Sequence, residues 1–249
     1  MNPTFSIITP LFNAERYFQE TFDSVINQTY KDFEWIVVND KSTDGSLSLA
    51  KSLAEKDPRV KVIALEENRG SAHARNIGLD NATGRYVTFL DADDLLDPNY
   101  LESQLAFIQD NGPIISSGYR RKAETTITEF HVPEVTTYES ILKGNPLSCL
   151  STVYDRTVFP DERFPEDMDR HEDFVFWARL LKQGYTAKGN PKVLATYRIV
   201  KHSKNSSKIK LIKPMVKAYH RKLGFSLFRS WLLTFGYVLY SRKKYRGVR

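Results

Sequence analysis

Short apolar runs alternate with helix-like segments along the first half of the chain. The runs are rich in β-branched and aromatic residues, and they cover residues 5–9, 33–39, 60–65, 85–90 and 114–119. Helical spacing of apolar residues begins at about Ala14 and recurs at 46–56, 71–82 and 97–110, where Gly84 follows the third segment. This alternation predicts an α/β fold with a mostly parallel, Rossmann-like sheet and helices on both faces.

The second half is less regular. The pattern indicates an extended segment at 125–132, a short helix at 138–144, and strands at 148–155 and 192–200. Residues 170–184 form a clear amphipathic helix pattern, with Phe174, Trp177, Leu180 and Leu181 on one face. From Leu211 the chain is again helix-like, so the fold is predicted to end in a helical tail.

Composition sets the broad class. With 249 residues and 41% hydrophobic content, the chain suits one large domain or a domain with a tail. Its one cysteine, Cys149, excludes an intrachain disulfide and fits a reducing compartment. The first residues lack the pattern of a signal peptide, so we expect none. No apolar run approaches the roughly 18 residues of a membrane span.

Charge is unevenly distributed along the chain. The formal net charge is +6, yet 14 of the 36 Lys and Arg residues, and no Asp or Glu, lie in 201–249. The other 22 basic residues stand against 30 acidic ones in 1–200, a net charge of −8. A basic tail with interleaved aromatic residues favours attachment to an anionic membrane surface. Packing against the acidic body is the main alternative, and we expect no nucleic-acid partner.

Three aspartates directly follow the predicted strand at 85–90. In open α/β sheets ligands bind at the carboxyl ends of the strands, and residues 10–13, 39–40 and 91–94 all follow strands. Asp91 and Asp93 can hold Mg²⁺ or Mn²⁺ together with substrate phosphates. Helix capping is the alternative, but Asp97, followed by Pro98 at the first helical position, is predicted to cap that helix.

Other polar residues near this edge point to a nucleotide. Asp40 ends the second strand, where a carboxylate can accept hydrogen bonds from a base or a ribose, although a simple turn is the alternative. Arg75 can bond a phosphate from the helix at 71–82, whereas His73 fits a surface position. Glu172 and Asp173 begin the helix at 170–184, where a general base and a favourable helix-dipole position are about equally supported.

Four pieces of this sequence together resemble the family 2 glycosyltransferases of GT-A fold. They are "FSIITPLFNAERYFQETFDSVINQTYKDFEWIVVNDKSTDGS", "NRGSAHARNIGLDNATGRYVTF", "LDADD" and "HEDFVFW", in the order and spacing of the family from about Phe5 to Val200. The resemblance is strongest to the bacterial enzymes that build surface polysaccharides. It implies an inverting transfer of a sugar from a nucleotide-diphosphate sugar, most often a UDP-sugar, to a saccharide hydroxyl.

The resemblance also implies roles for individual residues. Asp93, with Asp91, would bind the divalent metal, Asp173 would be the catalytic base, and Glu172 would position it or touch the acceptor. Trp177 would pack beneath them. Asp40 would contact the uracil or ribose, and Arg75 would lie near the base or phosphates. The full nucleotide-binding set is Thr9, Pro10, Phe12, Asn13, Asp40, Arg75, Asp91 and Ala92.

The expected organisation follows from the same resemblance. Residues 1–118 would form the nucleotide-binding half of a GT-A domain, 119–200 the acceptor-binding half, and 201–249 a basic loop and helical tail. The loop at 201–208, with Lys201, His202 and Lys204, is a candidate lid over the diphosphate. An acceptor on a polyprenyl-linked lipid would place the protein in the cytoplasm, at the inner face of the cell membrane.

Two departures and two rival functions accompany this interpretation. The family often has an acidic residue at Asn39 and a glycine at Lys41, and the lysine adds charge at the pocket mouth. A nucleotidyltransferase would also use nucleotide and metal, but the segment "TPLFNAER" lacks the glycine-rich phosphate loop common in those enzymes. A non-catalytic nucleotide-sugar-binding module is the second rival, although the motif residues are intact.

Overall fold

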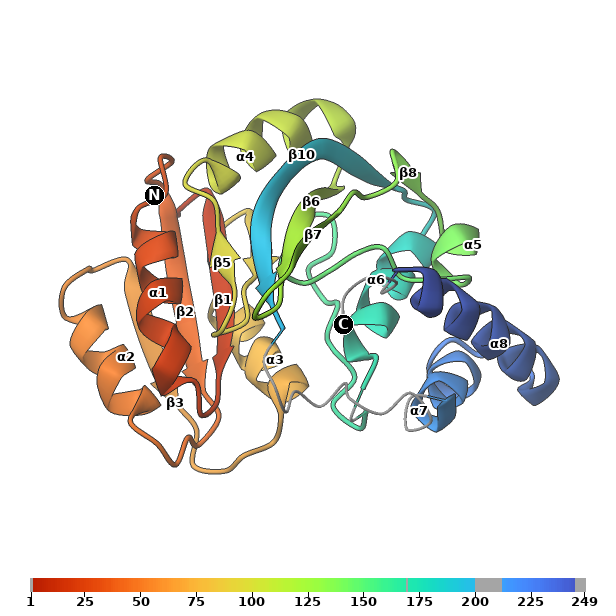
Figure 1. Ribbon diagram of the computed structural model, residues 1–249, viewed down its shortest axis with the longest axis horizontal. Helices are drawn as coiled ribbons and strands as arrows, with labels where there is room; N and C mark the ends of the chain where they lie inside the picture. Colours follow the sequence, from red (N-terminus) through yellow and green to blue (C-terminus); the bar gives the residue numbers. More distant parts are fainter. Residues whose placement is uncertain (1, 169, 200–211, 245–249) are drawn as a thin grey trace.

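The computed structural model describes residues 2–168, 170–199 and 212–244 (Figure 1). Its described strands form one ten-stranded sheet in the order β3-β2-β1-β4-β9-β6-β10-β5, with β7 paired to β6 and β8 to β10. Helices cover both faces of this sheet. The predicted α/β class and the central sheet are therefore confirmed.

Four parallel strands form the amino-terminal half of the sheet. They coincide with four predicted runs: β1 (Phe5–Leu11), β2 (Phe33–Asn39), β3 (Val60–Ala64) and β4 (Tyr86–Phe89). The connecting helices are α1 (Glu15–Ile26), α2 (Ser46–Ala54) and α3 (Ser71–Asn81). Every residue of β2 is buried, because helices cover both faces of the sheet, and this explains its continuous apolar character.

The other half of the sheet mixes strand directions. β6 (Ile114–Lys122) and β10 (Ala187–Arg198) are parallel, but β9 (Thr152–Asp155) lies between β4 and β6 and runs antiparallel to both. The short strands are β5 (Leu95–Leu96), β7 (Ile127–Phe130) and β8 (Val135–Thr136). The strand predicted at 148–155 is shorter because residues 149–151 turn, and the one predicted at 192–200 begins earlier, at Ala187.

The prediction that Asp97 caps the next helix, with Pro98 at its first position, is wrong. α4 (Tyr100–Asn111) begins at Tyr100, two residues later than predicted, and Asn99 is its N-cap. The Asp97 carboxylate forms an ion pair with Arg120 of β6 instead. Only the Asp97 carbonyl meets the helix, accepting a hydrogen bond from the Tyr100 amide at 2.9 Å. The preceding residues pair with β10 as β5, which holds this segment extended.

Two apolar layers enclose the sheet. On one face, α1, α2 and α4 pack around Trp35, whose ring contacts Phe18 and Phe22 at centroid distances of 5.7 Å. On the other face lie α3, α5 (Tyr138–Ile141) and α6 (Glu172–Lys182), packed around Phe89 and Trp177. The predicted apolar face of α6 is buried, as its spacing required.

The carboxyl-terminal helices pack beside α6, at the right of Figure 1. They are α7 (Ile212–Lys217), a π-helical turn (Ala218–Lys222) and α8 (Leu227–Lys244). Met215 and Tyr219 are buried in the same apolar layer as α6, and the Tyr219 hydroxyl donates to the Leu142 carbonyl at 2.5 Å. None of the described helices combines the length and apolar character needed to cross a bilayer.

Candidate active site

The predicted site residues lie where β1, β2 and β4 end together. Leu11 pairs with Asn39, and Ile8 pairs with Phe89, so the loops after these three strands leave one edge of the sheet side by side. α3 and α6 begin near the same edge, since Arg75 and Glu172 are in contact. The tertiary structure therefore brings together acidic motifs that lie about 80 residues apart in the sequence.

Asp40 is buried and orders the loop before α3. Its two carboxylate oxygens accept hydrogen bonds from the backbone amides of Arg69 (2.9 Å) and Gly70 (2.8 Å). Its carbonyl accepts a third from the Asn68 side chain at 2.9 Å. Gly70 has a φ of +89°, a conformation that L side chains rarely adopt. Asp40 thus holds the wall of the site, and each oxygen keeps a second lone pair for a ligand.

The residues after β1 have distinct positions. Thr9 is fully buried, and its hydroxyl accepts a hydrogen bond from the Trp35 indole at 2.9 Å, so it supports the loop from the core. Pro10 is half-buried, whereas Phe12 is 49% exposed and presents a ring on which a base can stack. The Asn13 side chain accepts from the Thr43 amide at 2.8 Å, which ties this loop to the one after β2.

The three aspartates after β4 have three different environments. The Asp94 amide donates to the Asp91 carbonyl at 3.0 Å, which makes a tight turn, and buried Ala92 lies within it. Burial and the charge of Asp91 raise the pKa of Asp93 to about 6, against the opposing charge of Arg198. Asp94 is fully buried and accepts from the Arg198 amide at 2.8 Å. Burial and its acidic neighbours raise its pKa well above the ordinary value.

Arg75 connects the two acidic motifs. It is only 5% exposed, and its guanidinium bonds Asp91 at 2.7 Å and Glu172 at 3.3 Å. The same group lies over the Phe164 ring, 5.4 Å from its centroid. Burial alone would lower the pKa of Arg75, but the charges of Asp91 and Glu172 outweigh it, and the net effect raises the pKa. The guanidinium is therefore permanently charged. The two carboxylates fix the orientation of the Arg75 guanidinium.

Glu172 and Asp173 occupy the first turn of α6 but face different partners. Oε1 of Glu172 accepts hydrogen bonds from Arg75 and from the Ser71 hydroxyl, the latter at 3.1 Å. The Asp173 carboxylate accepts from the buried Asn145 amide at 3.4 Å. The helix is entered through His171, which has a φ of +64° and makes no side-chain capping bond. The Glu172 side chain therefore bonds residues of α3 across the site and does not cap its own helix.

Three residues near the site carried no signal in the sequence. The Cys149 thiol is buried, which raises its pKa, and it lies within electrostatic range of Arg75, Asp91, Glu172 and Asp173. Arg198, at the end of β10, acts on Asp93 and Asp94, and Asn145 comes from the segment after α5. Each reaches the site only through long-range strand and loop placement, so local patterns could not identify it.

A metal at this edge would depend on substrate oxygens. Over residues 2–168, 170–199 and 212–244, no cluster of three or more His, Cys, Asp or Glu side chains is arranged to hold an ion. Mg²⁺ and Mn²⁺ commonly take one or two carboxylates and complete their shell with phosphates and water. Asp93, whose raised pKa shows that its negative charge is poorly compensated, fits that donor set.

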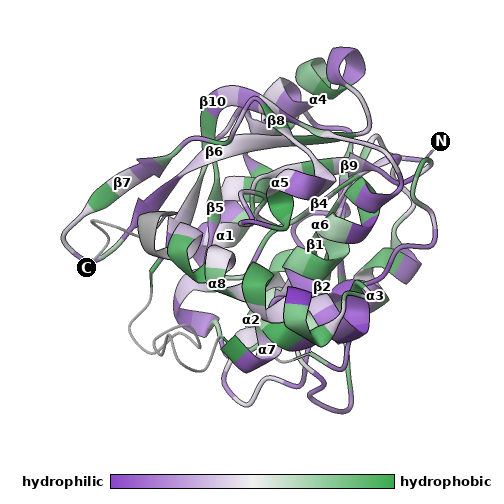
Figure 2. Ribbon diagram, turned by 90° about the vertical axis from the view of Figure 1, so that its right-hand side faces the viewer, coloured by the Kyte–Doolittle hydropathy of each residue, from purple (hydrophilic) through white to green (hydrophobic). Residues whose placement is uncertain are grey.

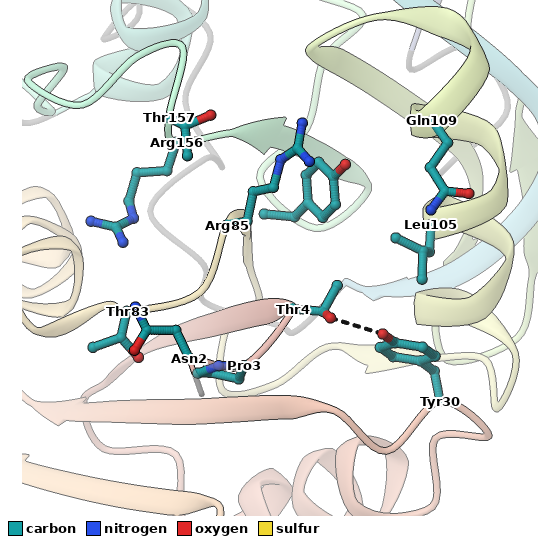
Figure 3. A pocket seen from close by; sticks show the side chains of 11 residues that line it. Asn2, Pro3, Thr4, Tyr30, Thr83, Arg85, Leu105, Gln109, Arg156 and Thr157 are labelled. Carbon is teal, nitrogen blue, oxygen red and sulfur yellow. Dashed lines mark hydrogen bonds between the residues drawn. The ribbon is translucent and has the colours of Figure 1, made fainter.

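The opposite edge of the sheet also holds a hollow, of about 470 Å³ (Figure 3). Thr4, Tyr30, Arg85, Arg156 and Gln109 line it. The Tyr30 hydroxyl donates to Thr4 at 2.8 Å. The hollow lies at the amino ends of the strands, away from the aspartates, and none of the predicted site residues lines it.

Comparison with known proteins places this geometry in a family. The sequence model described as Glycosyl transferase family 2 matches residues 6–159. The chain is 40% identical over 215 residues to "Putative teichuronic acid biosynthesis glycosyltransferase TuaG" of Bacillus subtilis (strain 168), covering 85% of each chain. It is 34% identical over 211 residues to "UDP-Glc:alpha-D-GlcNAc-diphosphoundecaprenol beta-1,3-glucosyltransferase WfgD" of Escherichia coli, covering 84% of this chain and 82% of that one.

Solved structures agree on the fold. S. aureus TarS 1-349 in complex with UDP-GlcNAc superposes with a TM-score of 0.76 at 22% identity, covering all of this chain and 76% of that one. The mannosyltransferase PcManGT from Pyrobaculum calidifontis, in complex with GDP-Man and Mn2+, gives 0.71 at 21% identity and covers 96% and 70%. The chain therefore has the GT-A fold and belongs to glycosyl transferase family 2, of the bacterial surface-polysaccharide type.

Proposed function

We propose that this glycosyltransferase transfers a sugar from a UDP-sugar to a hydroxyl of a lipid-linked saccharide, with inversion, during synthesis of a bacterial surface polysaccharide. One observation carries the proposal: Arg75 joins Asp91, in the turn Asp91-Ala92-Asp93 (the D-x-D turn), to Glu172 beside Asp173. Donor-side and acceptor-side carboxylates thereby share one edge of the sheet. The name of WfgD, with a UDP-Glc donor and a diphosphoundecaprenol acceptor, supports the same classes of substrate here.

The donor would occupy the loops after β1, β2 and β4. Phe12 and Asn13 offer a ring and an amide to the base, and Asp40 offers carboxylate lone pairs to the base or ribose. Asp93 would hold the divalent ion, with the Asp91 oxygen that does not bond Arg75 as a second ligand. The ion, when bound, neutralises the diphosphate and so stabilises the leaving group.

Asp173 would act as the general base. Its carboxylate takes the proton of the acceptor hydroxyl while that oxygen forms a bond to the anomeric carbon. The bond from this carbon to the diphosphate oxygen breaks on the opposite face, and UDP leaves with the electron pair. A single displacement needs no covalent sugar intermediate, so one base suffices. Glu172, held by Arg75 and Ser71, would position the acceptor rather than take the proton.

The remaining predictions concern closure and location. The proposed lid at 201–208, with Lys201, His202 and Lys204, lies outside the described residues. We place the protein in the cytoplasm at the inner face of the membrane, because a diphosphate-lipid acceptor would be embedded there. Residues 201–249 would provide the attachment, through their 14 basic side chains and the absence of acidic ones.

Calorimetric titration of UDP, with and without Mn²⁺, tests the donor site. We expect metal-dependent binding in wild type, its loss in Asp93→Ala, and its retention in Asp173→Asn and in the exposed control Asp110→Asn. Asp173→Asn should lose sugar transfer while it still binds UDP. Release of UDP rather than pyrophosphate distinguishes glycosyl transfer from nucleotidyl transfer. Absence of UDP binding, with or without metal, would contradict the proposed donor, and donor binding without turnover would support the non-catalytic module.

A further inference from the structure

One face of α8 exposes large apolar side chains to solvent. The exposed residues recur at three- and four-residue spacing, so they line a single stripe on the helix. They are Leu227 (55% exposed), Phe228 (76%), Trp231 (55%), Leu232 (59%), Phe235 (68%) and Leu239 (49%). We call these six residues the α8 stripe. Soluble monomers rarely expose so many contiguous apolar groups, and such a patch marks an interaction surface.

The opposite face of α8 carries the small polar residues. Ser230 and Thr234 are 0% and 2% exposed, and their hydroxyls donate to the backbone carbonyls four residues before them, those of Ser226 (2.8 Å), which directly precedes α8, and Ser230 (2.7 Å). An ordinary surface helix buries its large apolar residues and exposes its polar ones. α8 differs from this pattern: Leu233 and Tyr237 pack on the protein beside Ser230 and Thr234, yet six more large apolar residues face solvent. The large residues outside therefore need an apolar environment of their own.

The charges around the α8 stripe favour an anionic lipid surface over a protein partner. Arg229 is exposed on α8, and Arg242, Lys243 and Lys244 follow the last residue of the stripe in sequence. No acidic residue occurs anywhere in 201–249. Basic residues flanking an aromatic, apolar face are typical of helices that lie in the membrane interface. A second copy of this chain would instead place these like charges near one another.

The α8 stripe has a fixed relation to the proposed acceptor side of the active site. The Tyr237 ring packs on Phe174 of α6 at 5.6 Å and on His171 at 5.7 Å between centroids. His171 immediately precedes Glu172 and Asp173. In Figure 2, α8 faces the viewer with hydrophobic residues along it, on the side of the molecule where α5 and α7 also lie. A surface bound to the stripe is therefore held at a constant distance from the proposed base.

We propose that the α8 stripe is a membrane-docking surface that inserts into the headgroup region of an anionic bilayer. The helix has 18 residues and lies in the plane of the membrane rather than crossing it. The choice of a lipid surface rests in part on the proposed function, because a lipid-linked acceptor must be reached from the bilayer. The binding itself does not require catalysis, so it can be tested separately.

Flotation with vesicles tests the proposal on the full chain. We expect wild type to float with vesicles of phosphatidylglycerol and phosphatidylcholine and to bind pure phosphatidylcholine less. The double variant Trp231→Glu/Phe235→Glu should lose at least about tenfold in partitioning, because two charges must enter the interface. Ile127→Glu is the matched control, since Ile127 is 62% exposed on β7 and lies outside the stripe. Equal flotation of both variants and wild type would overturn the proposal.

Trp231 also provides an internal probe. Trp35 and Trp177 are fully buried, so Trp231 is the tryptophan that solvent reaches among the three in the chain. Vesicle binding should shift its emission to shorter wavelength, and brominated lipids should quench it. Trp231→Phe should abolish the shift and keep flotation. A wavelength shift that depends on protein concentration but not on lipid, with loss of a dimer in the double variant by sedimentation, would show self-association instead.

UDP calorimetry on the same samples separates the two proposals. The double variant should bind UDP like wild type, because the α8 stripe faces solvent and α8 packs mainly on α7 and the π-helical turn. A wild-type protein that floats but does not bind UDP would leave membrane docking intact and refute the donor assignment. A protein that binds UDP and does not float would refute docking alone.

Discussion

Two acids, the buried Glu34 and the half-buried Asp93, lie at opposite ends of the sheet, and their pKa values move in opposite directions. At the amino end, Glu34 is 4% exposed and accepts hydrogen bonds from Ser6, Lys61 and Thr83, each at 2.7 Å. Burial alone would raise its pKa, but these bonds lower it to about 2. At the carboxyl end, burial and Asp91 raise the pKa of Asp93 to about 6.

Glu34 is the less exposed of the two, so burial does not explain its lower pKa, and the difference lies in the supply of hydrogen-bond donors. The 83–84 turn gives Glu34 backbone amides and a hydroxyl, so the charge joins β1, β2 and β3 into one network. The D-x-D turn gives Asp93 further negative charge. A fully bonded carboxylate stabilises the fold, whereas one left short of donors costs stability until a cation binds. We therefore expect the amino end to serve stability and the carboxyl end to serve ligand binding, and the following changes test this difference.

Asp93→Asn should have the largest effect, and its effects on activity and stability should be opposite. Transfer should fall on the order of 10²- to 10³-fold, because the metal-bound diphosphate is no longer held. Folding raises the pKa of Asp93 to about 6, so above this pH the ionised carboxylate destabilises the folded wild type. Without divalent metal, the variant should therefore be more stable than wild type by about 1 to 3 kcal/mol. Urea unfolding in EDTA measures this. A variant that is both inactive and less stable would contradict the comparison.

Glu34→Gln should lower the free energy of unfolding by about 2 to 4 kcal/mol, because one side-chain oxygen acceptor becomes an NH₂ group facing donors. Under conditions where the variant is folded, its activity should stay near wild type, since Glu34 lies at the amino end of β2, away from the proposed active site. The exposed control Glu55→Gln should change stability by no more than about 0.5 kcal/mol. Loss of activity in a folded Glu34→Gln protein would refute the separation of tasks.

The Glu34 contribution should vanish in acid. Its pKa is about 2 in the folded protein and 4.5 ordinarily, so its stabilisation is complete above pH 4.5 and is lost as pH falls to 2. The shift corresponds to roughly 3 kcal/mol. The stability difference between wild type and Glu34→Gln, followed by urea unfolding, should therefore shrink across this window. A difference that stays constant from pH 6 to pH 2.5 would show that the network does not depend on the charge.

Arg75→Lys should have a smaller, purely kinetic effect. Lysine keeps the charge but cannot bond Asp91 and Glu172 with one planar group, so kcat should fall about 10- to 100-fold. UDP binding and KM for the donor should change little, which distinguishes a positioning residue from a phosphate ligand. Arg85→Lys, at the amino end and 60% exposed at its side chain, is the matched control and should leave kcat unchanged. A rise in donor KM as the main change would assign Arg75 to the phosphates.

Local patterns in the sequence determined much of this protein. Short apolar runs marked β1 to β4 and β6. In β1, β2 and β4 they are continuous, because strands buried on both faces leave no polar alternation, and helical spacing marked α1 and α6. The loops at strand ends, and hence the neighbourhood of Asp40 and Asp91, followed from the rule for α/β sheets. These features depend on residues that are close together in the sequence, so the sequence alone was enough to predict them.

Only the tertiary structure decided the rest, because it depends on contacts between distant segments. The antiparallel position of β9 and the pairing of Arg75 with Asp91 and Glu172 join segments far apart in the chain. The helix start at Tyr100 was decided by Asp97 pairing with Arg120 rather than by capping preference. The sequence predicted a helical tail from Leu211, but the bounds of α8 and the face that meets solvent were settled by packing, such as that of Tyr237 against α6.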